Sequence, residues 1–301
     1  MSRNTCFVYI LLIGNSILEG LATVVVGIIS YWMVQDFPVE ATFLSSDDRA
    51  RVLRRLAADK QGSAKVEVFK WKYFWQSVKD WKTTAFAIIY MGADMSLYAF
   101  SLFVPTIIKG MNPQYSATKA NLLSVPPYAV AAVATVFIGW LADRTGQRGC
   151  YNMGMSLFAI VGFAMLLGSG NAHVQYAGVF LGALGIYPCI PNTVSWTSNN
   201  VEGVYKRGVT LGFVIGWGNL NGVVSSNIYR GKDKPRYFLG HGVVLAYLTL
   251  FLFVGSTITR FLLARENKKR RNGLRNQWTE GKSQDEINEL GDKVPDFEYV
   301  L

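Results

Sequence analysis

A carboxylic acid inside an apolar stretch is the residue of this sequence that most strongly suggests chemistry. Asp94 lies four residues after Tyr90 and four before Tyr98, so a helix would place the three side chains on one face. Such a carboxyl group can carry a coupling proton, or it can hydrogen-bond a Ser, Thr or Asn of a neighbouring helix. Both uses remain open at this stage. Glu19 stands near the start of another apolar stretch, where it can stay hydrated, and we expect a structural role for it.

Amide and indole side chains in two later apolar stretches form a second candidate set. Asn192 and Trp196 follow two prolines and share a helical face, so they offer a polar group and an aromatic wall to a planar solute. A simple packing kink is the alternative. Trp217, Asn219 and Asn221 lie among glycines and are candidates to line the same cavity. Small residues at a spacing of four predict close helix packing, at Gly178, Gly182, Gly208, Gly212 and Gly216.

Motifs for other kinds of chemistry are missing from the sequence. There is no phosphate-binding loop of the GxxxxGK[ST] type, no GxSxG nucleophile motif, no HExxH zinc motif and no dinucleotide fingerprint. The two histidines, His173 and His241, stand near the ends of apolar runs, and the three cysteines show no metal-binding spacing. We therefore expect no enzyme activity, no cofactor and no metal site.

The elements that must position these residues are apolar helices. Half of the residues are hydrophobic, only 17% are charged, and the mean hydropathy is +0.21. A run of about 20 apolar residues is long enough to cross a bilayer as a helix. Seven such runs are predicted, at about 12–34, 84–107, 120–141, 150–169, 174–196, 208–228 and 239–263. The first is read as a retained span rather than a signal peptide, because its apolar character continues without a cleavage-like site.

Charge predicts how these spans are oriented. Most of the 30 Lys and Arg residues fall in loops on one side of a seven-span arrangement, and that side is expected to be cytoplasmic. The amino terminus is then outside and the carboxyl terminus cytoplasmic. Because orientation explains the net charge of +10, no nucleic-acid partner is expected.

The chain is expected to divide into four parts. Residues 1–34 form the first transmembrane helix, and residues 35–83 form a cytoplasmic loop. In this loop Ser45-Ser46-Asp47-Asp48 predicts a capped amphipathic helix, and Val68 to Trp75 mixes lysines with aromatic residues, as suits a membrane–water boundary. Residues 84–263 form six more helices. Residues 264–301 are polar and are expected to be a disordered cytoplasmic tail whose basic start lies near anionic lipid headgroups.

One short loop carries a recognisable motif, Gly139-Trp140-Leu141-Ala142-Asp143-Arg144-Thr145-Gly146-Gln147-Arg148. An acid at one helix end, cations around it and a glycine at the reversal can lock two helices together through charge-assisted hydrogen bonds. The motif resembles the cytoplasmic loop motif of the major facilitator superfamily, in which it acts as a conformational latch. The resemblance assigns that role to Gly139, Asp143, Arg144, Gly146 and Arg148, and it says nothing about the substrate.

More of the chain resembles one branch of that superfamily, the fungal allantoate permease-like anion:cation symporters, which include nicotinate and pantothenate transporters. Short matches follow in the family's order over about residues 17–260, among them Ile17-Leu18-Glu19-Gly20, Asp36-Phe37-Pro38, Phe43-Leu44-Ser45, Leu102-Phe103-Val104-Pro105-Thr106-Ile107-Ile108, Val125-Pro126-Pro127-Tyr128, Trp196-Thr197-Ser198-Asn199-Asn200 and Pro235-Arg236-Tyr237. The resemblance implies proton-coupled symport of a small organic anion such as allantoate, nicotinate or pantothenate across the plasma membrane. The polar and aromatic residues named above would then bind the solute.

The same resemblance implies that the chain holds only part of the fold. Members of this family have twelve helices, and the matching stretches correspond to helices six to twelve, the carboxyl-terminal half plus one helix. In such transporters two halves rock around a site at the bilayer midplane, so one half cannot alternate access alone. The chain is therefore expected to be truncated or to need an amino-terminal half as a partner.

Two other classes of function stay open. One is a non-transporting fragment or membrane interaction protein. The other is a seven-helix receptor, which fits the predicted topology but not the latch motif or the long loop after the first span.

Overall fold

The computed structural model describes residues 3–34, 41–58, 70–112, 114–234, 236–283, 286–287 and 290–301. These residues form helices, turns and loops, and no strand occurs among them, which confirms the all-helical class. The chain divides into two compact units, Met1–Ala64 and Lys65–Leu301. Each is described by itself.

The described part of the first unit contains two helices. Helix α1 (Arg3–Met33) is a continuous apolar helix, and its large side chains from Ile17 onward are exposed. The side chain of Glu19 lies outside the described residues. Helix α2 (Ser46–Ala58) begins where the sequence predicts, because the Asp48 N–H donates to Ser45 Oγ at 3.2 Å and Ser45 Oγ donates to the Asp48 carboxylate at 2.7 Å. The Ser45 hydroxyl thus satisfies one of the backbone donors at the helix start.

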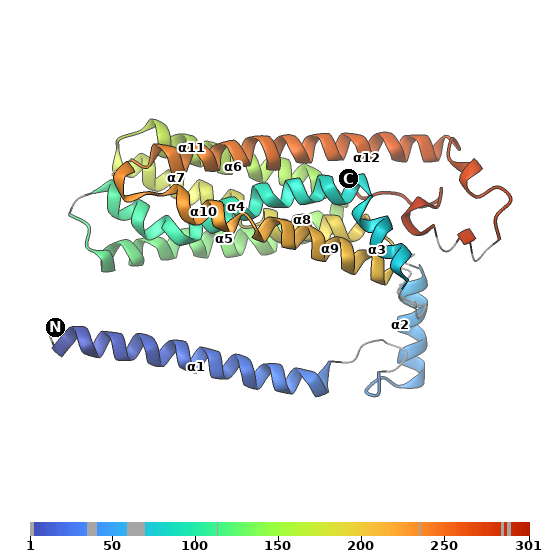
Figure 1. The fold of residues 1–301 in the computed structure, drawn as a ribbon, viewed down its shortest axis with the longest axis horizontal. Coiled ribbons are helices and arrows are strands. Elements are labelled where there is room, and N and C mark those ends of the chain that lie inside the picture. Colours follow the sequence, from blue (N-terminus) through green and yellow to red (C-terminus); the bar gives the residue numbers. More distant parts are fainter. Residues whose placement is uncertain are drawn as a thin grey trace. The chain divides into compact units, whose positions relative to one another are not determined.

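The second unit is a bundle of long helices (Figure 1). Among the described residues, five helical segments are long and apolar enough to cross a membrane: Trp81–Met111, Ala117–Thr145, Arg148–Gly168, Ala172–Asn199 and Phe238–Arg271. The elements in order are α3 (Trp71–Val78), α4 (Trp81–Met111), α5 (Ala117–Thr145), α6 (Arg148–Gly168), α7 (Ala172–Ile186), α8 (Cys189–Asn199), α9 (Val204–Asn219), α10 (Gly222–Ile228), α11 (Phe238–Ala246), the π-helical turn η3 (Tyr247–Val254) and α12 (Gly255–Arg271).

Glycines set the closest helix contact in this unit, between α6 and α7. A Cβ at Gly162 would stand 2.6 Å from the carbonyl oxygen of Gly178, and one at Gly178 would stand 2.7 Å from the carbonyl oxygen of Gly162. Gly182 also faces this contact, next to the rings of Phe100 and Phe163. The predicted packing role of Gly178 and Gly182 is confirmed. For Gly208, Gly212 and Gly216 it is not met among the described residues, since a Cβ there would touch nothing within 4 Å.

The stretch predicted as one span at 208–228 is instead two helices. Helix α9 ends at Asn219, and α10 begins at Gly222 after a turn at Leu220 and Asn221. A glycine-rich helix is easily interrupted, because glycine favours helix poorly and asparagine competes for backbone hydrogen bonds. The interruption places the side-chain amides of Asn219 and Asn221 at a turn in the middle of an apolar stretch.

The segment after α12 also differs from the sequence expectation. Residues 264–271 continue the helix to Arg271, and Gly291–Leu301 returns to pack on the helical bundle instead of staying disordered. Figure 1 shows the carboxyl end of the chain back at the end of the bundle where α3 lies. Residues 290–301 are called the docked tail below.

Candidate functional site

The predicted face of α4 is present, and it points at α9. Tyr90 and Asp94 are buried, and both approach Gly218: a Cβ on this glycine would lie 2.3 Å from Tyr90 Cδ1 and 3.3 Å from Asp94 Oδ2. One turn further along, the Tyr98 hydroxyl donates to Asn219 Oδ1 at 2.8 Å. The three α4 side chains therefore face one short stretch of α9, just before it breaks.

The Asp94 carboxyl group is the least satisfied polar group of this cluster. Its side chain belongs to a residue that is only 3% exposed, and Oδ2 has no hydrogen-bond partner among the described residues. Burying an ionised carboxylate without a partner is far more costly than burying the neutral acid. The alternative use considered from the sequence, a hydrogen bond from this oxygen to a neighbouring Ser, Thr or Asn, is not found in the described part of the chain.

The break between α9 and α10 is held by side-chain amides. Asn221 donates to the Trp217 carbonyl oxygen at 3.1 Å and accepts from the Tyr247 hydroxyl at 3.3 Å. Trp217 is 45% exposed and stacks on Phe213, with the ring centroids 6.3 Å apart. The break thus gathers two amides, two tyrosine hydroxyls and an exposed indole.

Asn192 and Trp196 are placed elsewhere, in α8. Asn192 is buried, donates to the Arg148 carbonyl oxygen and to Asn152 Oδ1, both at 2.8 Å, and accepts from the Arg148 guanidinium at 3.2 Å. Trp196 is fully buried against Phe86 at a centroid distance of 5.1 Å. Because their polar groups are already used inside the unit, the structure places these two residues in helix packing and not beside Asp94.

The latch loop has the predicted geometry. Gly146 ends α5 in the left-handed conformation, with φ of 65°, which a residue with a side chain adopts at a cost. The Arg148 guanidinium binds the Asp143 carboxylate across the reversal, and Arg144 lies over the ring of Trp140, 5.4 Å from its centroid. Gly139 touches nothing within 4 Å at its Cβ position. Asn192 also contacts the latch, because its side-chain oxygen accepts a hydrogen bond from the Arg148 guanidinium.

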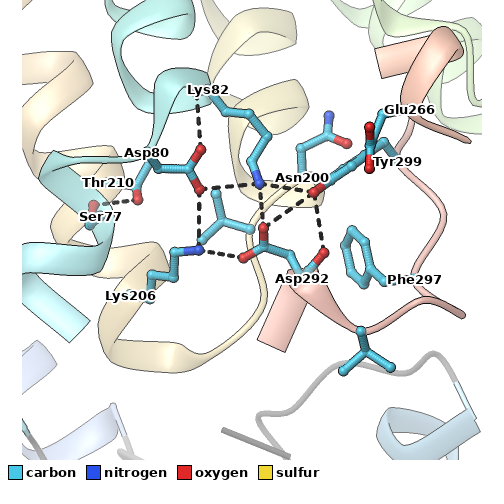
Figure 2. Close-up of polar contacts among 12 residues, drawn as sticks. Ser77, Asp80, Lys82, Asn200, Lys206, Thr210, Glu266, Asp292, Phe297 and Tyr299 are labelled. Atoms are coloured by element: carbon cyan, nitrogen blue, oxygen red, sulfur yellow. Dashed lines mark hydrogen bonds and ion pairs between the residues drawn. The ribbon is translucent and has the colours of Figure 1, made fainter. Parts of the chain in front are cut away.

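The docked tail covers the same end of the bundle through buried charges. Asp292 is 0% exposed and binds the ammonium groups of Lys82 in α4 and Lys206 in α9, the latter at 2.5 Å. Asp80 completes the cluster, with its carboxylate 3.2 Å from Lys82 and 3.3 Å from Lys206. Figure 2 shows these four side chains converging, with Tyr299 beside them. Two acids and two bases thus neutralise one another in the interior.

Two asparagine side chains bind the backbone of the docked tail. Each one donates to the carbonyl oxygen and accepts from the N–H of a single tail residue. Asn267 donates to the Tyr299 carbonyl oxygen at 2.8 Å and accepts from the Tyr299 N–H at 2.9 Å. Asn200 does the same for Val300, at 3.1 and 2.9 Å. The Gly149 N–H beside the latch donates to the Leu301 carbonyl oxygen at 3.2 Å. The tail is therefore tied to α6, α8 and α12 together.

Comparison with known proteins identifies the family. Residues 12–226 match the profile of the Major Facilitator Superfamily, and the chain belongs to this superfamily of membrane transport proteins. It is therefore a non-enzymatic, multi-pass membrane protein whose family members move small molecules.

The relatives it resembles are fungal transporters. It is 32% identical to an uncharacterized transporter of Schizosaccharomyces pombe, over 95% of this chain and 57% of the relative. It is 34% identical to the high-affinity nicotinic acid transporter of Saccharomyces cerevisiae, over 78% of this chain and 43% of the relative. These matches are consistent with the allantoate permease-like branch. The chain spans about half the length of the curated relatives it matches.

Proposed function

We propose that this chain forms the carboxyl-terminal half, with one preceding helix, of a transporter that carries a small organic carboxylate together with a proton. The family membership and the length relative to its relatives support the architecture. The similarity to a nicotinic acid transporter supports a small carboxylic acid as the solute. Allantoate and pantothenate belong to the same chemical class.

Asp94 is the observation that carries the proton-coupling part of the proposal. An acid with one unpartnered oxygen, buried in the middle of a membrane-length helix, is neutral when occluded as it is here. It can release its proton when a rearrangement brings water or a solute to it. The alternating access expected of this fold supplies such a rearrangement.

The same cluster supplies donors for an anionic solute. No Lys or Arg occurs between residues 83 and 108 or between 208 and 229, so neither of these two stretches offers a cation beside Asp94. The tyrosine hydroxyls and the amides of Asn219 and Asn221 would bind the carboxylate, and the Trp217 indole would stack on a planar ring. A cationic anchor would come from the other half of the transporter.

Orientation is proposed from charge. The docked tail and the latch lie at the same end of the bundle, together with most of the basic residues of this unit. The positive-inside rule then puts this end in the cytoplasm, and the plasma membrane is the proposed location.

The test joins this chain to the amino-terminal part of the Saccharomyces cerevisiae nicotinic acid transporter that the chain does not match. Reconstituted in vesicles, the joined protein should take up labelled nicotinate faster when the outside is acidic. Asp94→Asn should remove the acid stimulation. Ser96→Ala is the matched control, because Ser96 is also buried in α4 but bonds only to the Gly92 carbonyl oxygen of its own helix. An absence of uptake by a folded joined protein would favour the non-transporting alternative.

A further inference from the structure

A cavity lies at the latch end of the bundle, away from Asp94. It has a volume of about 800 Å³ and is bordered by α3, the start of α4, the end of α12 and the chain after α12. We call it the basic pocket, because eight lysine or arginine residues and only two acids line it. The transport mechanism proposed above makes no use of it.

The two acids of the basic pocket are already occupied. Glu266 accepts two hydrogen bonds from the Arg275 guanidinium, at 2.7 and 2.8 Å, and Asp80 lies between Lys82 and Lys206. In the described part of the chain, no carboxylate lies within ion-pair distance of Arg265 or Lys293, although both line the pocket. The cations in excess repel one another, and an anion in the cavity would relieve that repulsion.

Aromatic residues give the pocket a second character. Trp75, Trp81 and Trp278 line it, and Trp75 stands with Trp71 on the short helix α3, with both indoles largely exposed. Tryptophan beside lysine is typical of the level where lipid headgroups meet the hydrocarbon. The pocket therefore combines a boundary position with a surplus of positive charge contributed by several elements.

We propose that the basic pocket binds a phosphorylated anion of the inositol-phosphate type. A phosphate monoester brings a charge of about −1.5 to −2 and three acceptor oxygens, which suits several cations better than a single carboxylate does. The source is either the headgroup of a membrane lipid or a soluble phosphate ester. The docked tail contributes Lys293 and Tyr299 to the lining, so the bound anion would also stabilise the docked tail.

The test measures binding to the purified full chain in detergent and does not depend on transport. Native mass spectrometry during titration with a short-chain phosphatidylinositol bisphosphate gives its affinity, with short-chain phosphatidylserine and phosphatidylcholine as comparisons. The pocket variant is Arg265→Gln with Lys293→Gln. The matched control is Lys109→Gln with Lys119→Gln, which removes two exposed cations from the opposite end of the bundle. Gel filtration confirms that both variants are folded.

The pocket variant should bind the bisphosphate more than about tenfold more weakly, because each cation near an anionic headgroup contributes about a factor of five. The control should stay within about twofold. If inositol trisphosphate displaces the lipid, a soluble phosphate ester is sufficient to occupy the pocket. If the lipid stays bound, the ligand is the lipid itself. Either result supports the site. Equal losses in both variants, binding of phosphatidylserine as tight as that of the bisphosphate, or no binding of either inositol compound would overturn the proposal.

Discussion

Replacing Asp292 with Asn tests whether buried charge holds the tail on the bundle. The Asp292 carboxylate is 0% exposed and contacts both Lys82 and Lys206. Asparagine has nearly the same size but no charge, so the two lysines would share only Asp80. Removing one partner of a buried ion pair costs about 3–5 kcal/mol. The cost should fall on docking of the tail, since the helices stay packed through their apolar core.

Hydrogen exchange at Tyr299 and Val300 measures that docking directly. Their N–H groups donate to the side chains of Asn267 and Asn200, so these amides exchange only when the tail is released. Because about 1.4 kcal/mol is a factor of ten, a loss of about 3 kcal/mol should speed exchange by about 100-fold or more in Asp292→Asn. Mass spectrometry of the carboxyl-terminal peptide would report the change.

Asp296 provides the matched control for this experiment. It lies on the same segment but is exposed, so Asp296→Asn should change the two exchange rates by no more than about twofold. Unchanged protection in Asp292→Asn, or equal acceleration in Asp296→Asn, would refute the idea that the buried cluster holds the tail.

Three further predictions follow from the same contacts. Burial alone would raise the pKa of the Asp292 carboxyl, but its two lysine partners hold that pKa below the usual value. The charged carboxylate therefore stabilises docking fully above the free-acid pKa of about 3.9. This stabilisation is lost only as the pH falls through the lower pKa that Asp292 has in the docked tail. A spin label on the tail should therefore stay immobile from about pH 5 to 8, and release near pH 6 would contradict this assignment. Gly218→Ala drives a methyl group into Tyr90 and should lower the free energy of unfolding by about 1–3 kcal/mol, measured by thermal unfolding. Gly216→Ala is the control, because nothing lies near its Cβ position, and it should be neutral or slightly stabilising. Equal effects of the two substitutions would argue against the close contact of α9 with α4. In the latch, Asp143→Asn should lower the free energy of unfolding by less than about 1 kcal/mol, because its side chain is 68% exposed. Arg148→Gln should lower it by about 2–3 kcal/mol, because the buried guanidinium also donates a hydrogen bond to Asn192. The reverse order of the two unfolding temperatures would count against this network.

Local pattern predicted much of the fold. Apolar runs of membrane length located five of the helical segments, and the stretch Ser45-Ser46-Asp47-Asp48 predicted the start of α2 correctly. The latch and the α6–α7 glycine contact also follow from short-range spacing, because a glycine at a reversal or at intervals of four has few other uses. The shared face of Tyr90, Asp94 and Tyr98 needed only the helical period.

Features that depend on distant residues could not be predicted in this way. The tail is polar and resembles a disordered segment, yet Asp292 finds a partner 210 positions earlier in Lys82. Two asparagines, Asn267 and Asn200, bind the backbone of Tyr299 and Val300, and nothing in the local sequence pattern indicates these contacts. Asn192 and Trp196 share a helical face as expected, but only the packing of α6 shows that this face is buried. Hydropathy likewise gave no sign of the break at 220–221, since glycine, asparagine and valine average to an apolar run.

Simultaneous recording of proton and solute movement tests the central claim most directly. The joined protein would be placed in vesicles containing a pH-sensitive dye, and an inward gradient of labelled nicotinate would be applied without a pH gradient. The account predicts that nicotinate entry acidifies the vesicle interior, and that Asp94→Asn either moves nicotinate without moving protons or moves neither. Proton entry that accompanies nicotinate equally well in Asp94→Asn would contradict it.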